Sequence, residues 1–149
     1  MPKHHTVVAP KSHRHRRQLI LLLTLPVPVI GIANLIRLGM ALRYSALLPD
    51  LPMTVSWAYL AVMGGLWGVV FIICTVGLVR FRPWGRRMTM AAVTLYEAHV
   101  WLNHLVFDAS DYARLTIPRD LVLSILLLLI ILGTLNLPAL RMEFGAKAD

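Results

Sequence analysis

Four long apolar segments, set apart by charged residues, constrain this chain more than any other feature of its sequence. They cover residues 18–36, 55–79, 88–107 and 121–140, and the second contains no charged side chain. A helix needs about 20 apolar residues to cross the hydrocarbon core of a bilayer. Backbone groups in lipid must also be hydrogen-bonded internally, which at this length favours helices over strands. The pattern predicts an all-α integral membrane four-helix bundle.

Composition supports a lipid rather than an aqueous environment. Hydrophobic residues make up 58% of the 149 residues, and charged residues only 15%. A water-soluble fold of this size buries too little surface to hide so many apolar side chains. Because most of the charges lie outside the apolar segments, we expect the net charge of +8 to set orientation in the membrane. The expected partners are membrane lipids and not nucleic acid.

The distribution of Lys and Arg predicts which side of the membrane each link faces. One set of links and tails holds eleven: Lys3, Lys11, Arg14, Arg16, Arg17, Arg80, Arg82, Arg86, Arg87, Arg141 and Lys147. The opposite links hold three, Arg43, Arg114 and Arg119, if Arg37 at the edge of the first apolar segment is left uncounted. Since cytoplasmic links are rich in Lys and Arg, we predict both termini in the cytoplasm (N-in/C-in) of a multi-pass protein of the cell (inner) membrane.

The same layout divides the chain into one membrane domain with two tails. Residues 1–17 are predicted to form a basic, disordered cytoplasmic tail that touches anionic headgroups. Residues 18–141 hold the four spans, and residues 142–149 form a short cytoplasmic tail. The first tail is rich in His but lacks clear ligand spacing, so no metal site is predicted. The lone cysteine, Cys74, excludes an internal disulfide.

The third apolar segment carries nearly all the polar side chains predicted inside the membrane. Such groups are functional candidates, because placing them in lipid is costly. At about 100° per residue, Glu97 and His104 share one side of a helix, and His99 and Asn103 share nearly the opposite side. A helix that is polar on two faces is expected to contact other helices, or a second copy of the protein, on both.

Glu97 is expected about 14 Å from the start of its segment, close to the bilayer midplane. The favoured interpretation is structural, a neutral carboxylic acid in a buried hydrogen bond; the alternative is a proton-exchanging site in a transporter. Asn34 would reach Glu97 only if the first helix were kinked or tilted. Arg37 is better matched in depth to His104 and Asp108, with which it is predicted to form an outer cluster.

The two intramembrane histidines raise the question of haem. Axial haem ligands approach iron from opposite sides and normally come from different helices. Because His99 and His104 are on one segment, one chain cannot easily supply both, which leaves a homodimer or a single ligand. A zinc site at these histidines would lack a third protein ligand. We predict no cofactor.

Glycine and proline mark packing surfaces and links. Gly64, Gly65 and Gly68 are predicted to serve helix packing, since Gly64 and Gly68 form a Gly-x-x-x-Gly pair that lets another backbone approach closely. The link over 37–54 is expected to extend the first helix or to lie along the interface. Asp120 is expected in the first turn of the last helix, where the helix dipole favours a negative charge.

The link between the second and third apolar segments resembles that of known membrane proteins. An arginine-flanked turn with Pro83, Trp84 and Gly85 joins a segment rich in Gly and Trp to one with His99. This layout resembles small four-helix membrane proteins of bacteria, a resemblance that implies the fold and carries over no activity. The size and the midplane acid are also similar to small multidrug-resistance transporters, but those carry their acid in the first helix, and Glu97 is in the third.

The sequence contains no nucleotide-binding loop, paired carboxylates or nucleophile–base motif. We therefore expect a non-enzymatic accessory or assembly subunit, which packs against itself as a homo-oligomer or within a larger membrane complex. The alternative is a small proton-coupled transporter that uses Glu97. A third interpretation is haem or quinone binding through His99 or His104.

Overall fold

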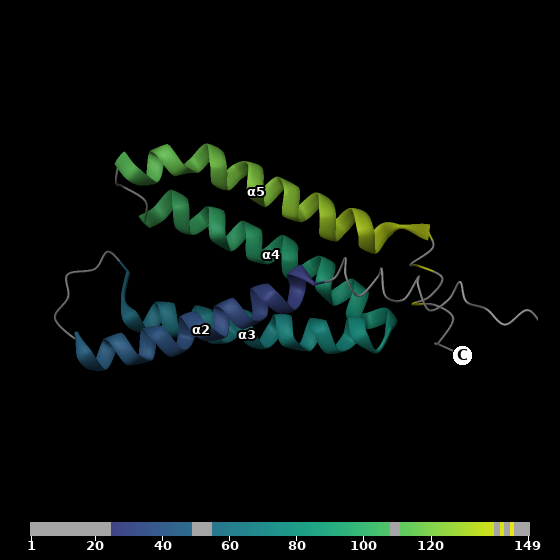
Figure 1. The fold of residues 1–149 in the computed structure, drawn as a ribbon, viewed down its shortest axis with the longest axis horizontal. Coiled ribbons are helices and arrows are strands. Elements are labelled where there is room, and N and C mark those ends of the chain that lie inside the picture. The colour runs from purple at the N-terminus through teal and green to yellow at the C-terminus, as the bar shows by residue number, and fades with distance from the viewer. Residues whose placement is uncertain (1–24, 49–54, 108–110, 139–140, 142–143, 145–149) are drawn as a thin grey trace, which may run out of the picture.

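The computed structural model describes residues 25–48, 55–107, 111–138, 141 and 144, with no side-chain description for 111–115. Its helices are α2 (Pro26–Leu47), α3 (Trp57–Val79), α4 (Pro83–Phe107) and α5 (Asp111–Asn136). They lie along one long axis (Figure 1). Within this described part, the prediction of an all-α chain with four helices is confirmed. The predicted tail 1–17, the start of the first span and most of 142–149 lie outside the described residues.

The helix at the start of the described chain is longer than the apolar pattern predicts. The apolar pattern ends at residue 36, and the link after it is predicted either to extend the helix or to lie along the interface. α2 continues to Leu47, so the first part of the link extends the helix. Leu48 then leaves the helical region, with φ −136° and ψ 62°. Leu48 precedes Pro49, and the residue before a proline is disfavoured in the α conformation. The proline, rather than the charge at residue 37, therefore determines where α2 ends.

The last helix begins earlier than predicted. α5 starts at Asp111, not at residue 121, and Pro118 lies inside it. The prediction that Asp120 occupies the first turn is therefore wrong. A proline inside a helix removes one backbone hydrogen bond without always ending the helix.

A tight turn connects α3 to α4. Phe81 is the one described non-glycine residue with positive φ, at 51°. The amide of Phe81 donates to the carbonyl of Leu78 (2.9 Å), and the amide of Arg82 donates to that of Gly77 (3.0 Å). This is the hydrogen-bond pattern of a Schellman cap, with Phe where glycine is usual. Pro83 then begins α4, a position where its missing amide costs nothing.

Small residues bring α2 and α3 into close contact. A Cβ added to Gly64 would lie 2.9 Å from the carbonyl oxygen of Asn34, and one added to Gly68 would lie 2.5 Å from a methyl of Leu35. Gly65 has more space, with Leu38 side-chain atoms at 3.6 Å. The Gly-x-x-x-Gly pair therefore lies at an interface within the chain.

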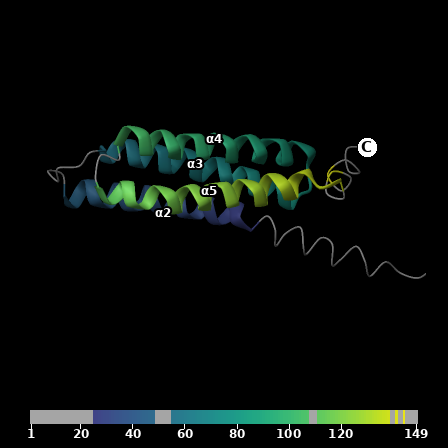
Figure 2. The same ribbon diagram turned by 90° about the horizontal axis from the view of Figure 1, so that it is seen from above.

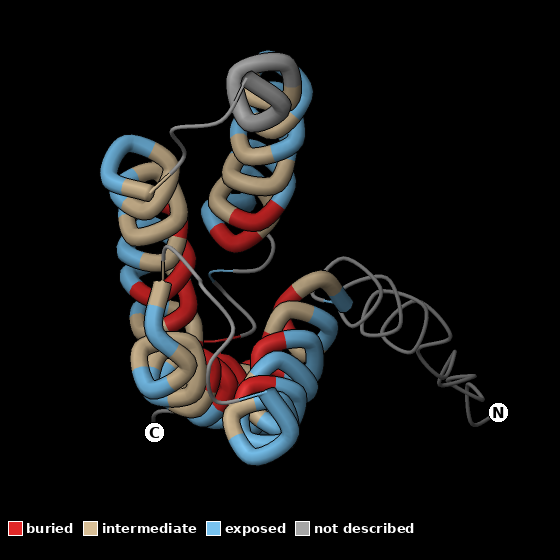
Figure 3. The backbone as a smooth tube through the Cα atoms, turned by 90° about the vertical axis from the view of Figure 1, so that its left-hand side faces the viewer, coloured by how far each residue is buried: buried red, intermediate tan, exposed pale blue. Residues whose placement is uncertain are grey.

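The helices form an open arc in which each packs mainly on the next: α2 on α3, α3 on α4, and α4 on α5. Figure 2 shows their lengthwise alignment from a second direction, and Figure 3 views the arc end-on, with buried residues toward its inside. The core includes fully buried side chains from α3, α4 and α5: Phe71, Cys74, Val93, Ile131 and Leu135.

Three stretches of the described chain are long and apolar enough to cross a membrane: α2, α3 and Thr116–Asn136 within α5. α4, predicted as the third span, does not reach the same apolar content over the described residues. Its sequence explains the difference, because two arginines near its start and Glu97, His99, Asn103 and His104 interrupt the apolar run. Many apolar side chains of α5 are exposed, although Ile131 and Leu135 are fully buried.

Candidate functional site

One polar face of α4 is hydrogen-bonded to α2 and α3. The hydroxyl of Tyr59 on α3 donates to Oδ1 of Asn103 (2.5 Å), and Nδ2 of Asn103 lies 3.0 Å from Nε2 of His99. The Nδ2 group of Asn34 donates to the Tyr96 hydroxyl (3.3 Å). The polar side chains on this face thus find partners inside the chain.

Aromatic rings surround this network. The ring of Tyr96 makes edge contacts with Trp67 (5.3 Å between centroids) and Phe71 (5.2 Å). His99 lies against Trp67 at 5.7 Å and against Tyr59 at 6.2 Å. Such contacts exclude water and favour a fixed arrangement, because aromatic pairs add stabilisation beyond simple burial. This face has the character of a structural interface.

Asn34 does not contact Glu97. It is 5% exposed and its amide also donates to the backbone carbonyl of Ile30 at 2.9 Å. α2 therefore presents Asn34 to the Tyr96 face of α4, whereas Glu97 lies on the other face. The sequence predicts a contact between Asn34 and Glu97 only for a kinked or tilted first helix.

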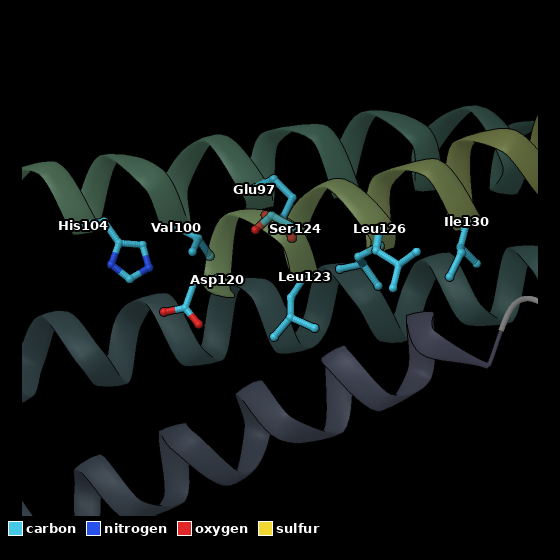
Figure 4. A pocket seen from close by; sticks show the side chains of 9 residues that line it. Glu97, Val100, His104, Asp120, Leu123, Ser124, Leu126 and Ile130 are labelled. Atoms are coloured by element: carbon cyan, nitrogen blue, oxygen red, sulfur yellow. The ribbon is translucent and has the colours of Figure 1, made fainter. Parts of the chain in front are cut away.

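The second polar face of α4 lines a groove with α5. The groove has a volume of about 440 Å³ and is lined from α4 by Glu97, Val100 and His104. α5 supplies the remaining side chains: Asp120, Leu123, Ser124, Leu126, Leu127 and Ile130. Figure 4 shows Glu97 beside Ser124, with His104 and Asp120 toward one end of the groove and Ile130 toward the other.

Glu97 is the notable group in this groove. It is 6% exposed, and its Oε2 atom is buried with no hydrogen-bond partner among the described residues. An ionised carboxylate without a partner in such surroundings costs several kcal/mol. A positively charged group beside Oε2 would supply the missing partner. No basic side chain lines the groove apart from His104.

Asp120, in contrast, is already paired. Arg119 Nη2 lies 2.9 Å from Oδ1 of Asp120, and the Asp120 side chain is 25% exposed. Along α4, the rings of His104 and Trp101 lie 5.4 Å apart. One end of the groove is thus polar and close to solvent-exposed charge, while Glu97 lies deeper along an apolar wall.

Arg37 and His104 line the same pocket, which lies on the α2–α3 side of α4 and also includes Tyr59 and Asn103. This agrees in position with the predicted outer cluster. Asp108, the third expected member, lies outside the described residues.

His99 lies against Trp67 of α3, whereas His104 lines both the α5 groove and the pocket on the α2–α3 side of α4. Among the residues that the structure describes, no three His, Cys, Asp or Glu side chains come together as a possible metal site.

An arginine cluster marks the end of the bundle where α3 meets α4. Arg86 Nε donates to the Leu135 carbonyl (2.7 Å), and its Nη2 donates to Oδ1 of Asn136 (3.2 Å). Arg141 donates to the same Asn136 oxygen (3.4 Å). Arg86 precedes the apolar run, and burial, followed by the charges of Arg141 and Arg87, lowers its pKa from the ordinary value. This contact joins the C-terminal end of α5 to the start of α4.

The sequence reasoning missed Tyr59 and the groove residues of α5. Tyr59 has no distinguishing pattern in its segment, and Ser124 is one hydroxyl in a run of Leu and Ile. Their importance depends on which turn of one helix lies beside which turn of the next, a register that hydropathy does not encode.

Comparison with known proteins found no matching family model, no matching curated protein and no matching solved structure.

Proposed function

We propose that this protein crosses the inner membrane four times, with both termini in the cytoplasm. α4 packs against α3 and is of similar length, so a bilayer crossed by α3 would also surround α4. The polar groups of α4 point toward other helices rather than outward. Arg80, Arg82 and Arg87 are exposed at the α3–α4 end, and Arg141 is tied to the same end. This clustering favours that end as the cytoplasmic side.

Reporter fusions test this topology. Alkaline phosphatase fused after Asp149 should be inactive, and the enzyme inserted in the link between Leu47 and Trp57 should be active. An active fusion at the C-terminus would contradict the proposed orientation.

Within this topology, we propose that the protein is a small proton-coupled transporter that binds cations at Glu97. The observation that carries the proposal is the buried Oε2 atom without a partner at the wall of an open groove. A carboxyl group in such a position can hold either a proton or a positively charged group, but not both. Binding of one therefore releases the other, which is the requirement for coupled exchange.

The walls of the groove indicate the class of cation. Leu123, Leu127 and Ile130 provide apolar surface on α5, and Val100 provides it on α4. Ligand sites of this kind bury an apolar body and place a few polar groups for orientation. We propose an organic cation with a hydrophobic body, whose charge lies against Glu97.

Proton release on binding gives a direct test. If the two compete, addition of tetraphenylphosphonium to the purified protein in weakly buffered detergent should release protons. In Glu97→Gln this release, and cation-driven proton flux in proteoliposomes, should be lost. Thr94→Ala, on an exposed position of α4 outside the groove, is the control and should behave like the unmodified protein. Equal proton release from Glu97→Gln would refute the proposal.

A second candidate is the accessory or assembly subunit. It is favoured by α5, whose apolar side chains are largely exposed, with Leu129 at 66% and Val122 at 63%. Either lipid or a protein partner can cover such a surface. Co-purification in a mild detergent tests this role, since a lone monomer without partner proteins would count against it.

The haem or quinone interpretation has less support, because Nε2 of His99 already contacts Asn103. A purified protein without a visible absorbance band would exclude haem.

A further inference from the structure

Arg37 lies at the junction of two pockets. One, of about 340 Å³, lies between α2, α3 and α4 and includes Tyr59, Leu60 and Phe107. The other, of about 390 Å³, lies between α2 and α3 and includes Met40, Tyr44 and Trp57. Both therefore gather residues from the last turns of α2 or α4 and the first turn of α3. They open at one end of the bundle, opposite the arginine cluster.

The guanidinium of Arg37 has no ion pair or hydrogen bond with any of the described residues, and Arg37 is exposed. Arginine has five donors in a planar fork that suits phosphate oxygens. A charge within an otherwise apolar segment is costly unless something pairs with it. The position thus calls for an anion from outside the described chain.

The surroundings indicate the form of that anion. Ile36 and Met40, beside Arg37 on α2, are 57% and 50% exposed, and the pocket walls include Leu60 and Phe107. Apolar surface next to an exposed cation, near the ends of apolar helices, matches a molecule with an anionic head and hydrocarbon chains. Tyr44 and Trp57, stacked at 6.0 Å, add the aromatic pair typical of headgroup level.

We propose that Arg37 is the centre of a binding site for an anionic phospholipid, with the phosphodiester on the guanidinium and the acyl chains along α2 and α3. This site is centred on Arg37 and not on Glu97, although Val100 and His104 line both the 340 Å³ pocket and the groove that is proposed to bind a cation. The group that Arg37 binds is a phosphate, and this phosphate belongs to a lipid headgroup rather than to a free phosphate ion.

The test measures phosphatidylglycerol binding to the full chain by native mass spectrometry across a lipid titration. Arg37→Gln should weaken the tightest binding step roughly tenfold, as expected for loss of a charge-assisted contact. Arg37→Lys should fall between the two, because it keeps the charge but loses the planar fork. Arg43→Gln is the matched control, an exposed arginine on the same helix that lines neither pocket, and should bind like the unmodified protein.

Two outcomes would overturn the proposal. If Arg37→Gln and Arg43→Gln lost the same affinity, the arginines would act only through net charge. If inorganic phosphate at millimolar concentration displaced the lipid and bound equally well by itself, the site would belong to a soluble anion. Circular dichroism of Arg37→Gln should match that of the unmodified protein, because the guanidinium has no hydrogen bond or ion pair with the described residues that the substitution would remove.

Discussion

At the scale of single residues, α4 places some polar side chains in hydrogen bonds with α2 and α3 and others in the groove beside α5. The 100° spacing of a helix predicts from sequence that Glu97 and His104 lie apart from His99 and Asn103. In the structure Glu97 lines the α5 groove and His99 contacts Asn103, but His104 lines both that groove and the pocket that includes Asn103. The partners on each face were not predictable. Tyr59 reaches Asn103 only because the first turn of α3 lies beside the last turns of α4, and that register depends on the whole set of packing contacts.

Tyr59→Phe should destabilise the protein without changing its fold. The substitution removes the donor to Asn103 and leaves a partly buried amide oxygen without that bond. Hydrogen bonds between membrane helices contribute about 0.6 kcal/mol on average and up to about 1.7 kcal/mol, so we expect a loss within that range. Thermal unfolding in detergent measures it.

Thr94→Ala is the control for this loss. Its hydroxyl donates only to the carbonyl of Met90 on its own helix (3.0 Å), and its side chain is exposed. If both variants lost the same stability, the Tyr59–Asn103 bond would have no special role between helices.

At the scale of helices, backbone contact through glycine joins α3 to α4. A Cβ at Gly85 would collide with the backbone carbon of Gly77, and one at Gly77 would lie 2.7 Å from Cα of Gly85. The Gly64–Gly68 pair is visible in the sequence as a spacing of four. The Gly77–Gly85 pair is not, because its members lie on different helices and meet only after the chain reverses at Phe81.

Gly85→Ala should therefore destabilise the α3–α4 hairpin. Extra atoms in a closely packed interface cost about 1–3 kcal/mol, and backbone atoms of Gly77 cannot rotate away as a side chain would. The midpoint of thermal unfolding, followed by circular dichroism, should fall accordingly.

Gly133 offers a matched comparison on α5. A Cβ there has no atom within 4 Å, and alanine favours helix over glycine by up to about 1 kcal/mol. Gly133→Ala should leave the unfolding midpoint unchanged or raise it. A lower midpoint in Gly133→Ala, equal to that of Gly85→Ala, would show that any added methyl is harmful and would contradict the packing argument.

At the scale of the whole molecule, the open arc sets what the chain can do. The length and hydropathy of the apolar segments predict four helices. The distribution of Lys and Arg predicts which ends of these helices carry the positive charge. The order of packing is not encoded in these patterns, since apolar faces in a membrane protein are equivalent in lipid. The Glu97 groove exists because α5 packs on α4 alone among the main interfaces.

The attachment of α5 therefore decides whether the groove keeps its shape. Its C-terminal end is held by the two hydrogen bonds from Arg86 to Leu135 and Asn136. Hydrogen bonds that involve a charged group contribute about 1.5–3 kcal/mol, so Arg86→Ala should release this end. Hydrogen exchange followed by mass spectrometry should show faster exchange around Leu135, while the contact between α2 and α3 stays protected. Arg87→Ala removes the same charge from an exposed neighbour without a described bond to α5, and should leave exchange unchanged. If Arg87→Ala loosened α5 as much as Arg86→Ala, repulsion within the arginine cluster, rather than the bonds of Arg86, would control the width of the groove.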